Sequence, residues 1–456
     1  MDSPLTLPSP PTGERDRARG RQNLIPASCL EMNRMYPQVL FQNRRPDRIT
    51  TLDEYRKSGG YEALEMTLKQ HTPKEVQKIV LDAKLLGRGG AGFSCGLKWQ
   101  SVADHAPFPR YIITNIDEME PGTFKDRVMS HADPHMILEG TILAAYAVSA
   151  QKAFLFIRPS YETCALIFDR EVRIAREAGF LGKNILGSDF SLEIVVHRSG
   201  GRYICGEGTA QLNAIEGKRP NPRGTPPYAT DKGLWELPTV LNNMETLANV
   251  PHILRHGGEW FRSLGKNKDA AGTKLYCVSG HVKTPGCFEL PMGTPLSEII
   301  EEHGGGLLPG SEYKTCLPGG ASTRFLPKEH YRIAMDFGPL KAIKNRLGTG
   351  GVIVFDHKAC LVGAALNLMD FFVRESCGWC TPCREGLPFI RDLLQRIEAG
   401  EGREEYIPML QQMCKHTWKS FCVFAPGATM PVESLLTYFG DEVREHISQK
   451  KCPFKD

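Results

Sequence analysis

Three cysteines separated by two residues each constrain the fold of this chain more than any other feature. Cys377, Cys380 and Cys383 lie within Glu-Ser-Cys-Gly-Trp-Cys-Thr-Pro-Cys-Arg-Glu-Gly, at residues 375–386. Thiolates this close in sequence can point at one centre, which suits three corners of a cubane iron–sulfur cluster and leaves the fourth iron to a distant ligand. Cys422, 39 residues beyond Cys383, is the predicted fourth ligand.

Two alternatives to this assignment stay open. Four cysteines can hold a structural zinc ion, although zinc sites usually present two separated pairs and not a triplet plus a single residue. Cys414 also follows the triplet and competes with Cys422 for the fourth position. The ten cysteines outside the predicted set are scattered, and each is expected to be a small buried hydrophobe.

The bulk properties exclude several classes of protein. A chain of 456 residues is expected to form about three domains. A net charge of +4, with no basic run interleaved with aromatic residues, argues against a nucleic-acid partner. No apolar stretch is long enough to span a bilayer, so no direct membrane insertion is expected. Fourteen cysteines without a secretory signal favour a reducing compartment.

The first 50 residues are predicted to be a disordered or extended segment. Residues 1–34 are rich in proline, arginine and serine and show almost no apolar periodicity. A mitochondrial presequence is the functional alternative, but four acidic residues spoil its acid-poor pattern. Translation starting at Met35 is a third possibility.

A glycine-rich loop follows a helical pattern that spans residues 51–86. Residues 87–92 read Gly-Arg-Gly-Gly-Ala-Gly, a literal G-x-G-x-x-G, but they follow a helix and not a strand, unlike an ordinary dinucleotide-binding loop. Bare glycine amides can nonetheless approach a phosphate or a flat ring closely, and Arg88 and Lys98 add positive charge. A flexible turn at the helix exit is the alternative.

Polar residues follow a β-rich run at residues 110–117. Asn115, Asp117, Glu118 and Glu120 stand at its carboxyl end, where open α/β sheets bind ligands. Three carboxylates so close together repel one another unless they bond hydroxyls or cations, so we favour a ligand-binding role over a solvated turn.

Helices and strands are then predicted to alternate, which is typical of a parallel sheet. The predicted ranges are helices at 135–151 and 161–178 and strands at 153–158 and 191–197. A second glycine-rich loop at residues 200–208 contains Tyr203 and Glu207. A polar cluster beginning at Asn242 is predicted to open a helix that continues to residue 254.

The pattern of predicted helices and strands changes after residue 257. Two strands at 273–280 and 286–290 and a helix at 295–302 predict a small β-rich domain. Beyond it, a strand at 352–355 precedes helices at 360–374, 385–399, 404–415 and 432–447. The predicted domains are therefore residues 51–257 for an α/β domain, 258–340 for the β-rich domain and 341–456 for a helical bundle that carries the cysteine triplet.

Five motifs in this order resemble the flavin- and NADH-binding subunit of respiratory complex I, from about residue 50 to about 447. They are residues 87–93, 115–125 (Asn-Ile-Asp-Glu-Met-Glu-Pro-Gly-Thr-Phe-Lys), 203–207 (Tyr-Ile-Cys-Gly-Glu), 242–246 (Asn-Asn-Met-Glu-Thr) and the cysteine triplet. The resemblance implies an α/β protein with a Rossmann-like flavin/NADH domain, a ubiquitin-like (β-grasp) domain and a C-terminal helical bundle with an iron–sulfur cluster.

The resemblance also implies roles for individual residues. Phe93 would stack on the adenine of NADH, Glu120 would lie near the nicotinamide sugar, and Tyr228 would line the same cavity. The four cysteines would ligate a [4Fe-4S] cluster. Non-covalent FMN would be cradled by Gly87, Arg88, Gly89, Gly90, Lys98, Asn115, Asp117, Glu118, Tyr203, Gly206, Glu207, Asn242, Asn243 and Thr246.

The function implied is NADH:quinone oxidoreductase, a translocase-class enzyme. NADH gives up two electrons as a hydride, an iron–sulfur cluster accepts one, and flavin adapts between them, so no catalytic acid or base is expected. The implied partners are a thioredoxin-like [2Fe-2S] subunit and a large multi-cluster iron–sulfur subunit. The implied location is the cytoplasmic face of the bacterial inner membrane, as a peripheral part of a complex, with the mitochondrial matrix side as the alternative.

Two residues depart from the family pattern. Gly208 stands where a second glutamate usually follows Glu207, and Thr225 stands where a lysine usually precedes Pro-Pro. Both positions face the nucleotide in the family, so we expect Gly208 to relax discrimination against NADPH. The alternative functions are the diaphorase subunit of an NAD-dependent formate dehydrogenase or soluble hydrogenase, and a scaffold that binds no nucleotide.

Overall fold

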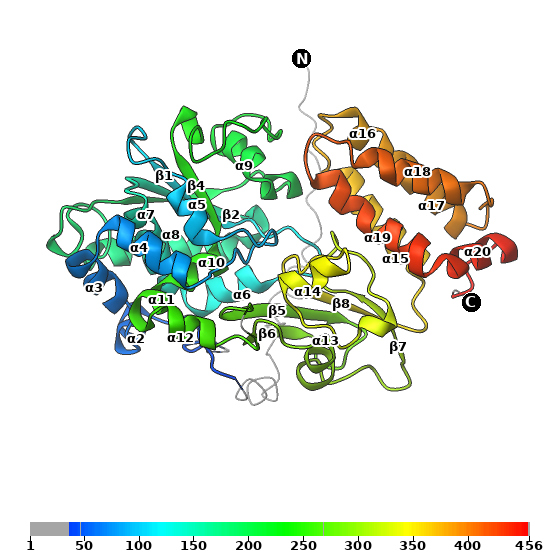
Figure 1. The fold of residues 1–456 in the computed structure, drawn as a ribbon, viewed down its shortest axis with the longest axis horizontal. Helices are drawn as coiled ribbons and strands as arrows, with labels where there is room; N and C mark the ends of the chain where they lie inside the picture. Colours follow the sequence, from blue (N-terminus) through cyan, green and yellow to red (C-terminus); the bar gives the residue numbers. More distant parts are fainter. Residues whose placement is uncertain (1–35, 46, 268, 455–456) are drawn as a thin grey trace, which may run out of the picture.

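The computed structural model describes residues 36–45, 47–267 and 269–454, arranged as two sheets and a helical bundle (Figure 1). The segment predicted to be disordered, residues 1–34, lies outside the described residues. Residues 36–45 lie beside the second sheet, where the buried Glu289 carboxylate accepts the amide hydrogens of Val39, Leu40 and Phe41 at 2.9–3.0 Å. None of the described helices is both long and apolar enough to cross a membrane.

The first sheet is fully parallel, in the order β3-β2-β1-β4. Its strands are β1 Tyr111–Ile116, β2 Lys152–Ile157, β3 Glu193–Arg198 and β4 Thr239–Asn243. The chain adds β2 and β3 on one side of β1 and then crosses to place β4 on the other, so the strand order reverses between β1 and β4. Open α/β sheets bind ligands outside the carboxyl ends of the strands at such a point.

Strand β4 is absent from the predicted elements, because the sequence around it indicates only the approach to a helix. Thr239–Asn243 is short and passes directly into α10 (Met244–Ala248), so it shows no hydrophobic periodicity of its own. The strand is defined instead by its pairing with β1, in which Asn242 and Asn243 lie opposite Thr114 and Asn115. The polar residues of two predicted motifs therefore meet at one edge of the sheet.

Helices cover both faces of this sheet (Figure 1). Thr51 and Thr72 form capping boxes with Glu54 and Glu75 at the starts of α2 and α4, and the Thr-Pro pair at residues 72–73 marks the start of α4. The helices are α2 Leu52–Lys57, α3 Glu62–Gln70, α4 Pro73–Asp82, α5 Cys95–Gln100, α6 Lys125–Ala132, α7 Pro134–Ala147, α8 Glu162–Glu177, α9 Gly208–Ile215, α10 Met244–Ala248, α11 Val250–His256 and α12 Gly258–Ser263.

The second sheet is mixed, in the order β6-β5-β8-β7. Its strands are β5 Thr273–Gly280, β6 Gly286–Pro291, β7 Tyr313–Leu317 and β8 Gly351–Asp356, with β5 and β8 parallel and the outer pairs antiparallel. Helices α13 Leu296–Glu298 and α14 Phe337–Ala342, with a π-helical turn at Ile299–His303, accompany it.

Strand β8 lies within residues 341–456, the range predicted for the helical bundle, although it is hydrogen-bonded inside the second sheet. Chain order places it with the helices that follow it, whereas its partners β5 and β7 come earlier. We therefore propose that the boundary between these two domains lies after residue 356.

The C-terminal bundle has its own apolar core, centred on Leu361, Phe372, Leu394 and Leu435. Its helices are α15 Leu361–Glu375, α16 Thr381–Arg384, α17 Gly386–Glu398, α18 Tyr406–Thr417, α19 Phe424–Tyr438 and α20 Gly440–Gln449. The single helix predicted at 432–447 is wrong: Phe439 has non-helical dihedral angles and separates α19 from α20.

Buried charges join the first sheet to the second. Lys125 Nζ lies 2.6 Å from Asp126 and 3.0 Å from Glu245, and Lys274 Nζ on β5 lies 3.5 Å from Glu245 and donates to the carbonyl of Arg88 at 3.3 Å. All four charged side chains are at most 3% exposed. Burial lowers the pKa of Lys274 to about 8, whereas two close carboxylates overcome burial and raise the pKa of Lys125.

Replacing Lys274 with methionine should destabilise the protein, because Glu245 loses one of its two cations in a site that water does not reach. Breaking a buried ion pair costs about 3–5 kcal/mol, so we expect the apparent midpoint of thermal unfolding to fall by about 5 °C or more. The matched control is Lys232→Met, which removes an exposed lysine 3.7 Å from Glu236. Equal midpoints for the two variants would contradict the role of the buried network.

Candidate functional site

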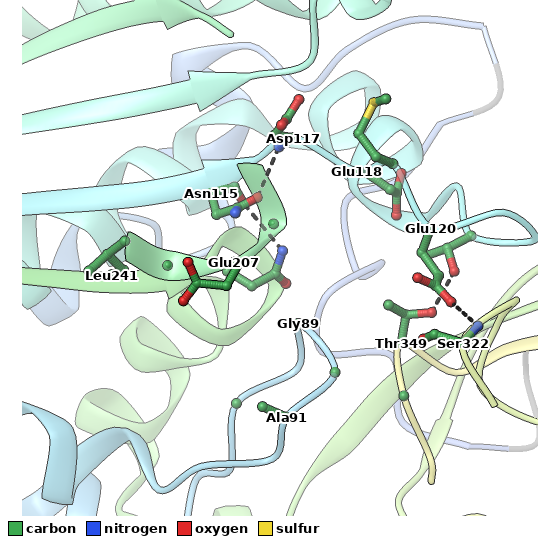
Figure 2. Close-up of a pocket in the computed structure, with 18 of the residues that line it drawn as sticks. Gly89, Ala91, Asn115, Asp117, Glu118, Glu120, Glu207, Leu241, Ser322 and Thr349 are labelled. Atoms are coloured by element: carbon green, nitrogen blue, oxygen red, sulfur yellow. Dashed lines mark hydrogen bonds between the residues drawn. The ribbon is translucent and has the colours of Figure 1, made fainter. Parts of the chain in front are cut away.

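A cavity of about 400 Å³ opens at the carboxyl edge of the first sheet, where the strand order reverses. Figure 2 shows Asn115 and Glu207 on one side of it, the glycine loop below, and Glu120, Ser322 and Thr349 on the other. The cavity is lined by fifteen of the seventeen predicted cofactor-binding residues, namely Gly87, Gly89, Gly90, Phe93, Lys98, Asn115, Asp117, Glu118, Glu120, Tyr203, Gly206, Glu207, Asn242, Asn243 and Thr246. Their roles toward a cofactor stay predictions.

The glycine loop forms one wall of the cavity with its bare backbone. A Cβ atom at Gly89 would lie 2.9 Å from the Cβ of Asn243, and Gly90 has a positive φ of 128°. The amide of Arg88 donates to Thr246 Oγ1 at 2.8 Å, which holds the loop against the start of α10. Only glycine fits this cradle, and the exposed amides can approach a phosphate or a flat ring.

The side chain of Arg88 does not line the cavity, and the role of its charge toward a ligand stays a prediction. It is 1% exposed, and its Nη2 donates to the carbonyl of Ala271 at 2.7 Å. Its guanidinium faces the junction with the second sheet, because buried carbonyl groups there need donors. Sequence adjacency predicts that Arg88 lies beside the glycines, but it does not predict the direction of the side chain.

The strand ends contribute amide side chains, and α5 contributes a lysine. Lys98 Nζ donates to the carbonyl of Leu241 at 2.8 Å, and Trp99 Nε1 donates to Asn242 Oδ1 at 3.0 Å. Burial lowers the pKa of Lys98. Asn243 Nδ2 donates to Asp126 at 2.7 Å, which connects the cavity floor to the buried charge network.

Two of the acidic side chains after β1 are buried. Asp117 accepts the hydroxyl hydrogen of Ser199 at 2.7 Å, and burial raises its pKa to about 6. Glu118 accepts the amide of Asp126 at 3.1 Å and the hydroxyl of Tyr161 at 3.1 Å; burial, then the charge of Asp126, raise its pKa to about 7. For both groups the cost of burying the ionised form outweighs the attraction of nearby cations.

Two buried side-chain atoms of cavity-lining residues have no hydrogen-bond partner among the described residues. They are Asp117 Oδ2, an acceptor, and Gln211 Nε2, a donor. Both residues line the cavity. Buried polar atoms without partners are costly, so this pair indicates a polar ligand with hydroxyl and carbonyl or ring-nitrogen groups, which FMN has.

Glu120 connects the α/β domain to the rest of the molecule. Its Oε2 accepts the hydroxyl of Tyr203 at 2.5 Å. Its Oε1 accepts the amide of Ser322 at 2.7 Å (Figure 2). Desolvation raises the pKa of Glu120. The carboxylate therefore positions the Tyr203 ring and the 319–323 turn on one side of the cavity.

The two predicted nucleotide-binding aromatics differ in position. Phe93 lies at the cavity with 56% of its surface exposed, and Lys98 Nζ lies 6.0 Å from its ring centroid. Tyr228 is 60% exposed and does not line the cavity. Its carbonyl accepts the amides of Asp231 and Lys232, which holds it in a separate turn. This structure therefore does not bring Tyr228 to the cavity, and its role toward the nucleotide stays a prediction.

The four predicted cluster ligands surround one small pocket. Cys377, Cys380, Cys383 and Cys422 line it together, whereas Cys414 does not. The amide of Phe421 donates to Cys380 Sγ at 3.4 Å. Burial raises the pKa of Cys383 to about 12, and the neighbouring thiols contribute. Four converging sulfurs with an amide donor fit a [4Fe-4S] cluster. The thiols lose their protons when their sulfurs ligate iron.

The cavity and the cysteine pocket have a common wall. Ile204 and Phe424 line both, and both side chains are buried. Sequence reasoning missed Phe424, together with the cavity-lining residues Lys125, Gln211, Ser322, Arg346 and Thr349. Lys125 is the last residue of the motif at 115–125 and could have been predicted from it. The other residues lie outside the five motifs.

The sequence matches three known families. The Nuo51 FMN-binding domain matches residues 80–252, the SLBB domain residues 275–326, and the NADH-ubiquinone oxidoreductase-F iron-sulfur binding region residues 363–446. Among curated proteins, the second F subunit of the Rhizobium meliloti NADH-quinone oxidoreductase is 45% identical over 421 residues, 92% of this chain and all of that protein. The F subunit of the Escherichia coli enzyme is 46% identical over 401 residues, 87% of this chain and 90% of that protein.

Among solved structures, an NAD+-reducing [NiFe]-hydrogenase in its H2-reduced state is similar, with a TM-score of 0.77 and 32% identity. The similarity covers 90% of this chain and 68% of the hydrogenase chain. It supports the α/β fold with a helical C-terminal region.

Replacing Cys422 with serine should lower the iron content well below the four atoms per cluster that a cubane holds, because one of four thiolates is lost. Cys414→Ser, a buried cysteine in the same bundle but outside the pocket, is the matched control and should retain its iron. Iron per chain, measured on the purified full-length protein, checks both. The opposite pattern would reassign the fourth ligand to Cys414.

Proposed function

The chain belongs to the family of the F subunit of NADH-quinone oxidoreductase, and on this premise we propose that the cavity binds FMN and NADH and that the four cysteines hold a [4Fe-4S] cluster. The protein oxidises NADH and passes the electrons on one at a time toward quinone. FMN supplies the conversion between a hydride and single electrons. The observation that carries this proposal is the common wall of the cavity and the cysteine pocket, formed by Ile204 and Phe424.

The residues of the cavity bind and orient the reactants in this proposal. The backbone of the glycine loop and Lys98, which line the cavity, would hold the flavin. Asp117 Oδ2 and Gln211 Nε2 gain the partners that they lack among the described residues. Phe93 presents an exposed aromatic face for the adenine ring. No side chain needs to move a proton, since hydride transfer depends on positioning.

As a member of this family, the protein is one component of a multisubunit enzyme and therefore has partner subunits. We propose a thioredoxin-like [2Fe-2S] subunit and a large multi-cluster iron–sulfur subunit as those partners. We also propose peripheral attachment, through the complex, to the cytoplasmic face of the bacterial membrane. The relatives favour the quinone enzyme over a diaphorase: they are 45–46% identical, against 32% for the hydrogenase chain.

An anaerobic NADH titration of the purified chain, followed by optical and EPR spectroscopy, tests this function. NADH should bleach the flavin absorption and then produce the EPR signal of a reduced cluster, in samples that contain one FMN and four irons per chain. A protein that contains both groups but does not respond to NADH would reject the proposal. A colourless protein with zinc in the cysteine pocket would favour the scaffold alternative.

Gly208→Glu should sharpen the preference for NADH. Gly208 lines the cavity, and a Cβ there would meet only Leu241 Cδ2, at 3.8 Å, so the protein has room for the side chain. The added carboxylate should repel the 2′-phosphate of NADPH and lower kcat/KM for NADPH relative to NADH about tenfold. Gly208→Gln is the control of equal size without charge. An unchanged or lower preference for NADH in Gly208→Glu would contradict the expectation.

A further inference from the structure

Four metal-ligating side chains meet at the far end of the helical bundle. Cys360 precedes α15, Glu398 ends α17, His446 lies in α20, and Cys452 lies in the tail beyond it; their ligand atoms are all within 4.8 Å of one another. From the sequence, the two cysteines are expected to be small buried hydrophobes. Their convergence comes from four separate segments and could not be read from spacing.

This cluster is distinct from the pocket of Cys377, Cys380, Cys383 and Cys422. Cys360 stands at the start of α15, whereas Cys377 follows its end. Fifteen helical residues separate the two positions by about 22 Å. None of the four ligating residues lines the FMN cavity or the cysteine pocket. The function proposed above therefore leaves this group of side chains without a role.

The distances in the cluster suit a tetrahedral ion. His446 Nε2 lies 3.3 Å from Cys360 Sγ and 3.3 Å from Glu398 Oε2, and Cys360 Sγ lies 3.3 Å from the same oxygen. A zinc ion bound at its usual distances, about 2.3 Å to sulfur and 2.0–2.2 Å to nitrogen and oxygen, separates its donor atoms by about 3.3–3.8 Å. These three donors need little movement to bind it, and the Cys452 sulfur lies within 4.8 Å of each of them.

The surroundings of His446 and Cys360 fix both as ligands. His446 is fully buried, and its Nδ1 lies 2.8 Å from the carbonyl oxygen of Glu442, so Nδ1 carries the proton and Nε2 faces the cluster. This is the carbonyl contact that orients most metal-bound histidines. The Cys360 sulfur accepts the amide of Gly363 at 3.1 Å, at the start of α15, and this contact fixes the position of the sulfur.

A glycine and a lysine lie beside the site. A Cβ atom at Gly363 would lie 3.2 Å from Glu398 and 3.4 Å from Cys360 Sγ, so a larger residue would crowd the ligands. Two thiolates and one carboxylate leave a zinc site with one net negative charge. Lys314 Nζ donates to the carbonyl of Ala359, beside Cys360, but it is paired with Glu442 Oε2 at 2.7 Å, so this ion pair adds no net charge.

We propose that Cys360, Glu398, His446 and Cys452 bind one structural zinc ion. With four protein ligands the site is closed, as structural zinc sites are, and binding releases the two thiol protons. The ion joins the start of α15, the end of α17, α20 and the C-terminal tail. Because α15 leads directly to Cys377, the ion would stabilise the bundle that presents the iron–sulfur ligands. This inference goes beyond the proposed function and does not depend on it.

The test is metal analysis and zinc X-ray absorption on the full-length protein, purified from zinc-supplemented cells with its iron and flavin. We expect one zinc per chain in addition to iron, with about two sulfur and two nitrogen or oxygen neighbours. Cys452→Ser and His446→Gln should each lose at least about nine-tenths of the zinc under a competing chelator. Cys414→Ser, the buried cysteine of α18, is the matched control and should keep it.

A further variant separates loss of metal from loss of folding. Cys452→Asp keeps an anionic ligand, so it should retain zinc with one sulfur neighbour fewer, and it should keep the iron content of the wild type. Wild-type protein with full iron but under about 0.1 zinc per chain would overturn the proposal. So would zinc that survives the combined loss of Cys452 and His446, or a shell of four sulfurs, which would place the ion in the iron–sulfur pocket.

Discussion

The burial of Lys125 and Lys274 beside Asp126 and Glu245 is the constraint on which the rest of the structure depends. Each lysine can remain in a site without water only while the carboxylates stay close to it. Lys274 comes from the second sheet, and the other three come from helices α6 and α10, which accompany the first sheet, so the network fixes the two sheets relative to each other. Its contact with the carbonyl of Arg88 extends this constraint to the glycine loop, which is therefore placed by charges and not by its own flexible backbone.

Function in this protein follows from two sites that have a wall in common. The cavity lies where the strand order of the first sheet reverses, and the cysteine pocket lies in the helical bundle. Glu120 bonds Tyr203 and the amide of Ser322, so a single carboxylate holds together two segments that line the cavity. Such an arrangement needs no acid or base near the reactants, since the chemistry belongs to the bound groups and the protein supplies their position.

Much of this site could be predicted because its residues lie in short motifs. The cysteine triplet, the glycine loop and the acidic stretch after β1 each carry their chemistry within about ten residues, where spacing alone limits the geometry. Side-chain direction was less predictable: Arg88 is adjacent to the glycines, yet its guanidinium bonds Ala271. Strand β4 and the membership of β8 in the second sheet were also not predicted, because pairing with distant strands defines them.

By itself, the sequence determined the local chemistry of this protein: three thiols at two-residue gaps, a backbone cradle without side chains, and the alternation that makes a parallel sheet. Only the tertiary structure decided which distant residues meet. Cys422, not Cys414, joins the triplet in one pocket, and Cys360, Glu398, His446 and Cys452 converge at the other end of the bundle. The physical reason is that spacing constrains neighbours along the chain, whereas helix packing, which sums many weak apolar contacts, sets the approach of segments far apart in sequence.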